Sequence, residues 1–267
     1  MRSRFLLAAA AALSSSACIG MLPAPTPMAA LNYTREADKP HRCLLVMLPG
    51  RGDRAADYAS HGFLDSLQKR PIAADVVVAD AVYGYYARRN LVERLKPDVV
   101  EPARARGYEE VWLFGISMGG LGSLFYAQRE PGLAAIVLFA PFLGDEEVID
   151  EISKAGGATA WKAPEKLAEE DYQRMLWGWL QGALAKGEPR VYLGFGTEDR
   201  MAPAHRLLAA ALPKDRVFQE SGGHDWATWR KLWDDFLEHS DFAQRCADTP
   251  SPQARKASGD EVERANN

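Results

Sequence analysis

The residue with the clearest chemical signature is Ser117, which lies in a G-x-S-x-G pattern at residues 115–119. The apolar run Val111–Ile116, a candidate strand, ends directly before Ser117. The stretch Met118–Arg129, a candidate helix, begins directly after it. A serine between a strand and a helix, flanked by glycines, sits on a sharp turn that holds its hydroxyl clear of the sheet. We therefore predict that Ser117 is a nucleophile. The alternative is an ordinary glycine-rich turn.

A serine hydroxyl is a weak nucleophile until a neighbouring base takes its proton. Of the five histidines, His224 lies between the last predicted strand and the last predicted helix, in the segment Gly-Gly-His-Asp-Trp. That position brings it to the sheet edge that carries Ser117. We predict that His224 is the base. The alternative is a loop histidine that only caps the helix.

A third group must hold the tautomer of the imidazole and stabilise its charged form. Two adjacent acids, Glu198 and Asp199, follow the penultimate predicted strand in the segment Gly-Thr-Glu-Asp-Arg-Met-Ala-Pro. Both are candidates on position alone, and a solvated charge on the loop is the alternative for either.

Acyl transfer also needs donors for the negatively charged oxygen that forms on the substrate. The segment Leu-Pro-Gly-Arg-Gly-Asp at residues 48–53 leaves the first predicted strand. We predict that the backbone N–H groups of Arg51 and Met118 form this oxyanion hole. Because the backbone supplies both donors, the side chains are free to vary. The alternative for Arg51 is a plain turn after a strand.

Short apolar runs alternate with amphipathic stretches along the chain, a pattern typical of a parallel sheet wrapped by helices. Several runs are continuously apolar, as strands buried on both faces should be. The sequence thus predicts an α/β fold with a mostly parallel sheet flanked by helices. The expected strands are Cys43–Leu48, Asp75–Val82, Val111–Ile116, Ala134–Ala140, Arg190–Phe195 and Arg216–Glu220; the expected helices are Ala55–Arg70, Arg89–Arg106, Met118–Arg129, His205–Leu212 and Trp226–His239.

The interval 144–188 between two predicted strands is longer than the usual connection of 2–6 residues or one helix. It holds helical stretches at Glu146–Lys154 and Glu165–Lys186. We expect a helical, lid-like insert over the carboxyl edge of the sheet, with Trp177 as a candidate substrate-lining residue. The alternative is that its tryptophans only attach the insert to the domain.

Three tyrosines, Tyr83, Tyr85 and Tyr86, follow the second predicted strand at the same edge and are further candidates for lining a substrate pocket. The alternative is a packed loop. No metal site is predicted, because no cluster of His, Cys and carboxylates shows ligand spacing. The net charge of −4 gives no reason to expect a nucleic-acid partner, which usually binds a basic stripe.

The N-terminus has the order of an export signal, with Arg2 and Arg4 before the short apolar stretch Phe5–Leu13. Small residues and then Cys18 follow, which resembles a bacterial lipoprotein signal with lipidation at Cys18. Residues 1–18 are therefore the expected signal peptide and residues 19–40 a linker. The predicted location is the bacterial cell envelope, with a lipid anchor as the membrane contact. Ordinary cleavage with release is the alternative.

The remaining cysteines, Cys43 and Cys246, are a candidate disulfide in an exported protein, with two free thiols as the alternative. The globular domain is expected to cover residues 41–242. Beyond it, residues 243–267 are polar and charged, and a disordered tail is predicted.

Together, Pro-Gly-Arg-Gly-Asp, Gly-Ile-Ser-Met-Gly-Gly, Gly-Thr-Glu-Asp-Arg-Met-Ala-Pro and Gly-Gly-His-Asp-Trp resemble the α/β-hydrolase superfamily of serine esterases and lipases. The resemblance favours Asp199 over Glu198 through the loop spacing G-x-x-D-x-x-x-P, and its chain order is serine, acid, histidine. It implies hydrolysis of carboxylic esters or thioesters through an acyl-enzyme, with no cofactor. Two departures are Pro-Gly in place of the common His-Gly and the lack of predicted strands before Cys43–Leu48.

A small-molecule ester is the expected substrate. An acyltransferase or a peptidase with the same three residues is an alternative, because the fold does not set the acceptor or the leaving group. A catalytically silent binding scaffold is another. The substrate's identity and the oligomeric state do not follow from the sequence.

Overall fold

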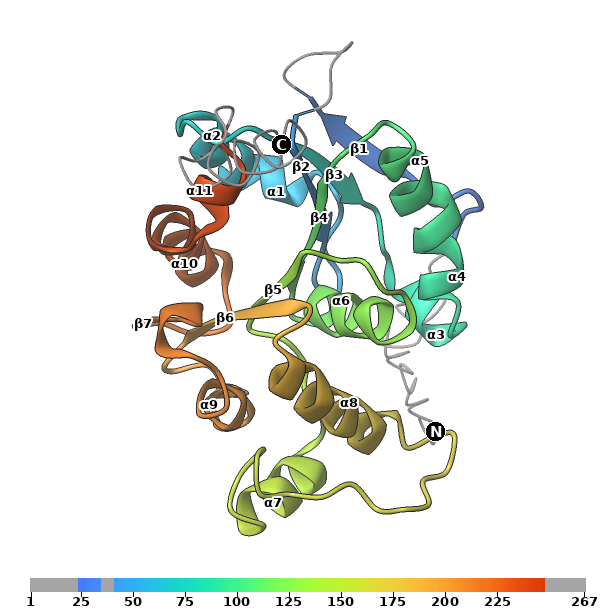
Figure 1. The fold of residues 1–267 in the computed structure, drawn as a ribbon, viewed down its shortest axis with the longest axis vertical. Helices are drawn as coiled ribbons and strands as arrows, with labels where there is room; N and C mark the ends of the chain where they lie inside the picture. The colour runs from blue at the N-terminus through green and yellow to red at the C-terminus, as the bar shows by residue number, and fades with distance from the viewer. Residues whose placement is uncertain (1–23, 35–40, 248–267) are drawn as a thin grey trace, which may run out of the picture.

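A seven-stranded sheet forms the centre of the computed structural model, which describes residues 24–34 and 41–247 (Figure 1). The strand order is β1-β3-β2-β4-β5-β6-β7, and every neighbouring pair is parallel except β1 with β3. The strands are β1 Ala30–Tyr33, β2 Cys43–Leu48, β3 Ala74–Ala79, β4 Glu110–Ile116, β5 Ala135–Phe139, β6 Arg190–Gly196 and β7 Val217–Glu220. The predicted α/β class with a mostly parallel sheet is confirmed.

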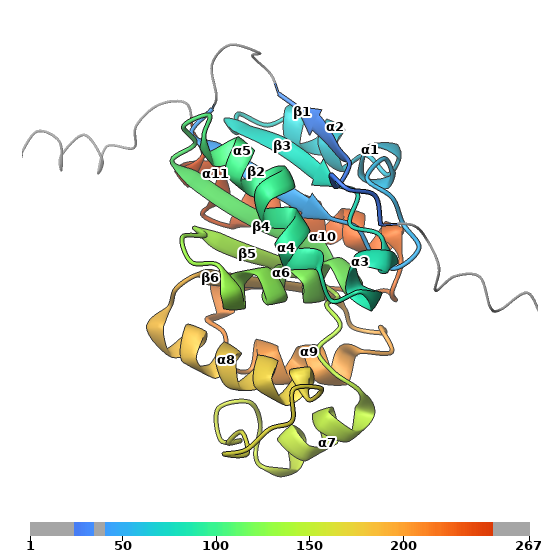
Figure 2. The same cartoon turned by 90° about the vertical axis from the view of Figure 1, so that its right-hand side faces the viewer.

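Helices cover both faces of this sheet (Figures 1 and 2). One apolar layer joins the sheet to α3–α6, α8 and α9, and the other joins it to α1, α2, α10 and α11. This two-sided burial explains why β2 to β5 are buried along their whole length and read as continuous apolar runs. The helices are α1 Asp57–Ser60, α2 Phe63–Gln68, α3 Tyr83–Ala87, α4 Leu91–Leu95, α5 Glu101–Arg104, α6 Met118–Arg129, α7 Glu146–Lys154, α8 Tyr172–Lys186, α9 Ala202–Ala209, α10 Trp226–His239 and α11 Phe242–Arg245.

Two long helices expected from the sequence are broken. The stretch 55–70 forms α1 and α2 because Gly62 between them adopts a left-handed conformation with φ of 74°. The stretch 89–106 contains a π-helical segment, Lys96–Val100, between α4 and α5. Pro97 and Pro102 fall inside this region, and proline cannot donate the hydrogen bond that a regular helix needs.

The segment 19–40 is not a linker throughout, which corrects the sequence prediction. Its described residues, 24–34, contain β1, which pairs antiparallel with β3 at the sheet edge. Met28 is buried and its N–H donates to Asp98 at 2.7 Å. A strand therefore does precede β2. The sequence pattern did not predict β1, because this strand is short and lies at the edge of the sheet, where Leu31 is exposed.

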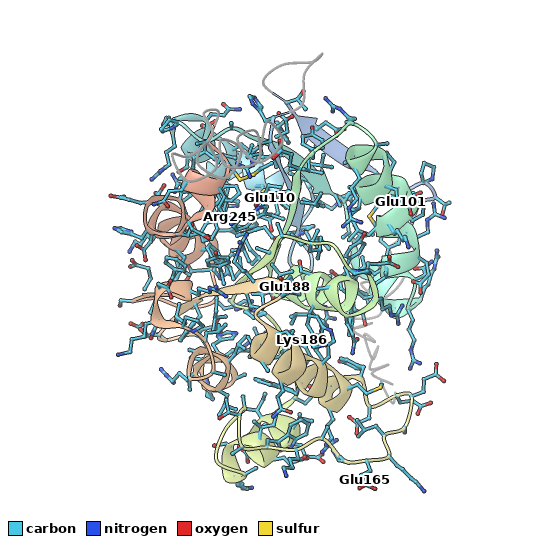
Figure 3. The ribbon with its side chains drawn as sticks, in the orientation of Figure 1. Glu101, Glu110, Glu165, Lys186, Glu188 and Arg245 are labelled. Atoms are coloured by element: carbon cyan, nitrogen blue, oxygen red, sulfur yellow. A yellow bond between two sulfur atoms is a disulfide. The ribbon has the colours of Figure 1, made fainter. Side chains whose placement is uncertain are left out.

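The insert between β5 and β6 is helical as predicted, and its two helices have different places. Helix α8 connects two parallel strands and packs beside α6, with Leu176 and Leu180 in the core. It is thus the crossover helix that a parallel pair requires. Helix α7 lies farther out, against α9 (Figure 2). The segment between them carries Glu165, at the opposite end of the molecule from Glu110 (Figure 3).

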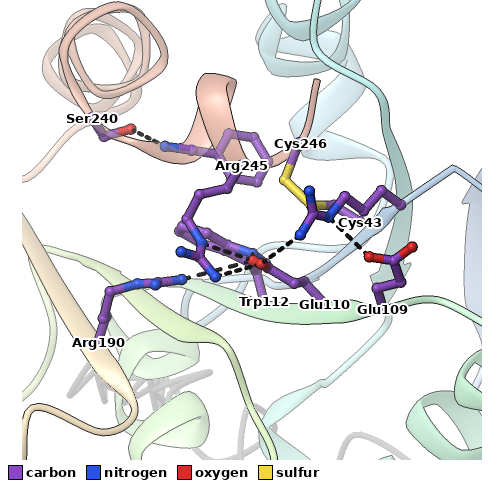
Figure 4. The surroundings of a disulfide bond; sticks show 10 residues. Cys43, Glu109, Glu110, Trp112, Arg190, Ser240, Arg245 and Cys246 are labelled. Carbon is purple, nitrogen blue, oxygen red and sulfur yellow. Dashed lines mark hydrogen bonds and ion pairs between the residues drawn. A yellow bond between two sulfur atoms is a disulfide. The ribbon is translucent and has the colours of Figure 1, made fainter. Parts of the chain in front are cut away.

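A disulfide between Cys43 and Cys246 joins the start of β2 to the end of α11 (Figure 4). The folded domain therefore runs past residue 242, which corrects the predicted boundary. Glu110, next to the bond, accepts hydrogen bonds from Arg245 and from the indole N–H of Trp112. Figures 3 and 4 show Arg245 turned toward Glu110, so the C-terminal segment is also held by an ion pair.

Removing this disulfide, which lies at the amino end of β2, should destabilise the fold without changing the carboxyl ends of the strands. We expect the double variant Cys43→Ala/Cys246→Ala to lose about 2–5 kcal/mol of unfolding free energy, because the unfolded chain regains the freedom of an open loop. Urea unfolding measures the difference. Dithiothreitol should lower the stability of the wild type and leave that of the double variant unchanged. Equal stability of both proteins without reductant would contradict the expectation.

The predicted signal peptide, the predicted lipidation site Cys18 and the predicted tail from residue 248 lie outside the described residues. Within 24–34 and 41–247, no helix is both long and apolar enough to cross a membrane.

Candidate active site

Ser117 occupies a strained turn between β4 and α6. Its φ of 54° is a left-handed value that a residue with a side chain rarely adopts. A Cβ on Gly115 would lie 2.2 Å from the Gly119 carbonyl oxygen, and one on Gly119 would lie 2.1 Å from that of Leu48. Only glycine fits at these two positions. The pattern of small residues around Ser117 therefore has a steric cause, as the sequence predicted.

His224 and Asp199 meet Ser117 at the carboxyl edge of the sheet. The three residues come from the turns after β7, β6 and β4. His224 Nε2 lies 2.9 Å from Ser117 Oγ, and His224 Nδ1 lies 2.7 Å from Asp199 Oδ2. A carboxylate only accepts, so Nδ1 carries the proton and Nε2 is left to accept from the serine hydroxyl. This is the order of hydrogen bonds that deprotonation of Ser117 requires.

The Asp199 side chain is fully buried, whereas the adjacent Glu198 is exposed and accepts from Ser221 Oγ at 3.0 Å. Burial acts to raise the pKa of Asp199, but the hydrogen bonds from His224 and from the Met201 N–H outweigh it and hold the pKa below its usual value. Asp199 is therefore a fixed anion beside the imidazole. Of the two acids, it is the one that the structure brings to His224.

The predicted oxyanion donors lie at the same edge. Met118 opens α6, where the helix dipole favours negative charge. Arg51 follows Gly50, and a Cβ on Gly50 would lie 3.7 Å from Ser117 Cβ, so this turn borders the serine. Within the described part of the chain, neither N–H donates to a protein acceptor. Both are free to bind an oxygen from a substrate.

The candidate lining residues divide into two groups. Tyr85 and Trp177 are fully buried and bonded inside the protein, through Tyr85 Oη to the Pro25 carbonyl and Trp177 Nε1 to the Leu143 carbonyl. The prediction that they line a substrate pocket is wrong, because both serve packing. Tyr83 is half-exposed, with the Arg51 guanidinium 5.0 Å from its ring centre. Tyr86 turns its hydroxyl inward, toward Gly122.

Two polar groups near the site were not assigned from the sequence. Asp80, at the end of β3, accepts from the Arg54 guanidinium and from the Ala55 N–H, and so ties the turn after β2 to the neighbouring strand. The available signal was an acid within the predicted strand Asp75–Val82, which in the structure ends at Ala79. His205 of α9 is fully buried and its Nε2 lies 2.9 Å from the Pro141 carbonyl oxygen. Nothing in a helical pattern distinguishes such a histidine.

His205 should make the stability of the protein depend on pH. Burial lowers the pKa of His205 to about 4. In the unfolded chain, by contrast, the imidazole takes up a proton near pH 6.5. The contribution of His205 to the unfolding free energy should therefore be constant above pH 6.5 and fall, by up to about 3 kcal/mol, as pH drops toward 4. Thermal unfolding from pH 7.5 to 4.5 tests this against His205→Gln, whose curve should be flatter over that range. Parallel curves would contradict it. The lowered pKa of Asp199 makes the unfolding free energy depend on pH only below the ordinary pKa of an aspartate, which lies outside the pH range of this experiment.

Comparison with known proteins places this geometry in context. The chain matches the model of the family described as "Putative esterase" over residues 79–239. That range runs from the end of β3 to the end of α10 and contains Ser117, Asp199 and His224. No curated protein matches the chain.

Solved structures resemble the chain in fold at low sequence identity. The S-formylglutathione hydrolase of Staphylococcus aureus gives a TM-score of 0.52 at 15% identity, over 80% of this chain and 98% of that one. The S-formylglutathione hydrolase of Agrobacterium tumefaciens gives 0.53 at 14% identity, over 82% and 90%. A ferulic acid esterase gives 0.51 at 13% identity, over 79% and 87%. The fold is that of the α/β-hydrolases, as the motifs predicted.

Proposed function

Since the chain belongs to this esterase family, a member of the α/β-hydrolase superfamily, we propose that it hydrolyses carboxylic esters or thioesters of small molecules through an acyl-enzyme. The observation that carries the proposal is the line of hydrogen bonds from Ser117 Oγ through His224 to Asp199. The free N–H groups of Arg51 and Met118 beside Ser117 support it.

In the proposed reaction, His224 Nε2 takes the hydroxyl proton of Ser117 while Oγ attacks the carbonyl carbon of the ester. The carbonyl oxygen becomes negatively charged and is stabilised by the two backbone N–H groups. The imidazolium then gives its proton to the departing alcohol or thiol, and the acyl group stays on Oγ. A water molecule, deprotonated by His224, releases the acid and restores the serine. Asp199 holds the imidazole in position and stabilises its positive charge throughout.

A fluorophosphonate probe and a panel of p-nitrophenyl esters of rising chain length test this proposal, with thioesters and aminoacyl amides alongside. Labelling at Ser117 together with ester turnover is the expected result. Turnover of amides but not of esters would favour a peptidase, and acyl transfer to an added alcohol in preference to water would favour an acyltransferase. If the probe does not label Ser117 and no ester is hydrolysed, the proposal is wrong and a catalytically silent binding scaffold is the remaining interpretation.

We also propose that the protein is exported to the bacterial cell envelope and lipidated at Cys18. The support is the signal-like N-terminus and the Cys43–Cys246 disulfide, since such bonds persist in oxidising compartments. The variant Cys18→Ser is expected to appear in the soluble fraction, or to remain unprocessed, while wild type sediments with membranes. If the two proteins fractionate alike, lipidation at Cys18 is excluded.

A further inference from the structure

Asp53 places a carboxylate beside the candidate nucleophile. It closes the turn after β2, where its N–H donates to the Gly50 carbonyl at 3.3 Å. A Cβ on Gly50 would lie 2.7 Å from Asp53 Oδ2 and 3.7 Å from Ser117 Cβ. The carboxylate and the serine therefore border the same small space. Asp53 is partly buried, so it has lost part of its water shell at this position.

The Asp53 carboxylate has two histidines nearby, His61 and His224, which interact with it electrostatically, but it is not paired with a lysine or an arginine among the described residues. The side chain of Trp226 forms a hydrogen bond with the carboxylate. The two neighbouring arginines are used elsewhere, because Arg54 binds Asp80 and Arg51 lies over the ring of Tyr83. In residues 24–34 and 41–247, no ion pair joins Asp53 to a lysine or an arginine. A partly buried carboxylate without such a partner favours a cation that comes from outside the chain.

Asp53 also lies close enough to His224, which must protonate the leaving group, to interact with it electrostatically. The departing alcohol must receive its proton from His224, so it lies next to that residue. Asp53 interacts electrostatically with His224, and its partner Trp226 is two positions further along the chain. A charge at Asp53 thus acts on the alcohol part of the substrate.

We propose that Asp53 is a specificity-determining residue that favours esters whose alcohol carries a positive charge, such as a quaternary ammonium group. The proposal rests on the proposed ester hydrolysis. At about 6 Å, and with an effective dielectric constant of about 40 for a site open to water, the attraction corresponds to about tenfold in kcat/KM.

The test compares two phenyl esters of the same shape, 3-(trimethylammonio)phenyl acetate and 3-tert-butylphenyl acetate, with wild type and Asp53→Asn. Burial raises the pKa of Asp53, so the assays are run at about pH 8 to favour the ionised carboxylate. Asparagine keeps an acceptor for Trp226 and removes only the charge. The kcat/KM ratio of the cationic to the neutral ester should fall about tenfold in the variant. Comparing the two enzymes cancels the difference in chemical reactivity between the esters.

Asp57→Asn is the matched control. Asp57 is a nearby carboxylate, four residues beyond Asp53, that accepts a hydrogen bond from the Arg54 N–H at 2.7 Å, and we expect its substitution to leave the ratio nearly unchanged. An unchanged ratio in Asp53→Asn would overturn the inference while leaving ester hydrolysis intact. Failure of wild type to cleave either ester or p-nitrophenyl acetate would instead refute the proposed function.

A second measurement uses wild type alone and applies even if Asp53→Asn does not fold. Salt screens charges, so the advantage of the cationic ester should shrink between about 0.01 and 1 M sodium chloride. The ratio for alkaline hydrolysis of the same two esters, measured at each salt concentration, is the reference. A salt-independent advantage would overturn the role of the carboxylate.

Discussion

Ser117→Ala is expected to abolish ester hydrolysis and to leave the protein folded. The substitution removes the atom that attacks the carbonyl carbon, and the cost in kcat should be on the order of 10⁶, as in serine hydrolases that lose the nucleophile. The fold should survive, because the only side-chain hydrogen bond of Ser117 in the described structure is the one with His224. The measurement is p-nitrophenyl acetate turnover beside thermal unfolding.

Ser221→Ala is a suitable control for Ser117→Ala. Ser221 lies on the same loop as His224, is exposed, and among the described residues its side chain hydrogen-bonds only to Glu198. Its loss should leave turnover and labelling by a fluorophosphonate probe nearly unchanged. Retained hydrolysis in Ser117→Ala, with an unchanged melting temperature, would show that the nucleophile is a different residue.

Asp199→Asn should lower kcat by about 10⁴. The asparagine oxygen can keep the hydrogen bond from the Met201 N–H, which turns the amide nitrogen toward His224 Nδ1. That nitrogen donates, so the imidazole must carry its proton on Nε2, where it can no longer accept from Ser117. The positive charge that forms on His224 would also lose its anionic partner. Steady-state kinetics on one ester at one pH measures the loss.

The neighbouring acid provides the control for Asp199→Asn. Glu198 is exposed and bound to Ser221, so Glu198→Gln should change kcat little, since an exposed charge contributes little. If Glu198→Gln were the crippled variant, the acid would be misassigned by one residue. If neither substitution mattered, the geometry at His224 Nδ1 would not be the one that operates in the reaction.

The central strands could be predicted from the sequence because both of their faces are buried. β2 has the predicted bounds, Cys43–Leu48, since all six residues face the interior on one side or the other. β1 gives no such signal, because an edge strand is paired on one side only and half of it is exposed. The break at Gly62 and the π-helical segment at Lys96–Val100 depend on backbone conformations that apolar periodicity does not reveal.

The candidate site shows the same division. Ser117, His224 and Asp199 could be named because each lies in a turn that directly follows a predicted strand. Tyr85 and Trp177 were misplaced because sequence position brings a residue to an edge but does not say which way its side chain turns. His205 was missed for a related reason, since its bond to Pro141 joins elements 64 residues apart.

The Cys43–Cys246 bond has a consequence for the covalent integrity of the molecule. The residues between the two cysteines form a closed ring, and Arg51, Ser117, Asp199 and His224 all lie within it. A single cut by a protease in any exposed loop of that ring opens it without separating the two pieces. On a gel the nicked chain would migrate as one band until a reductant is added. One broken peptide bond therefore cannot release either the serine or the histidine from the other.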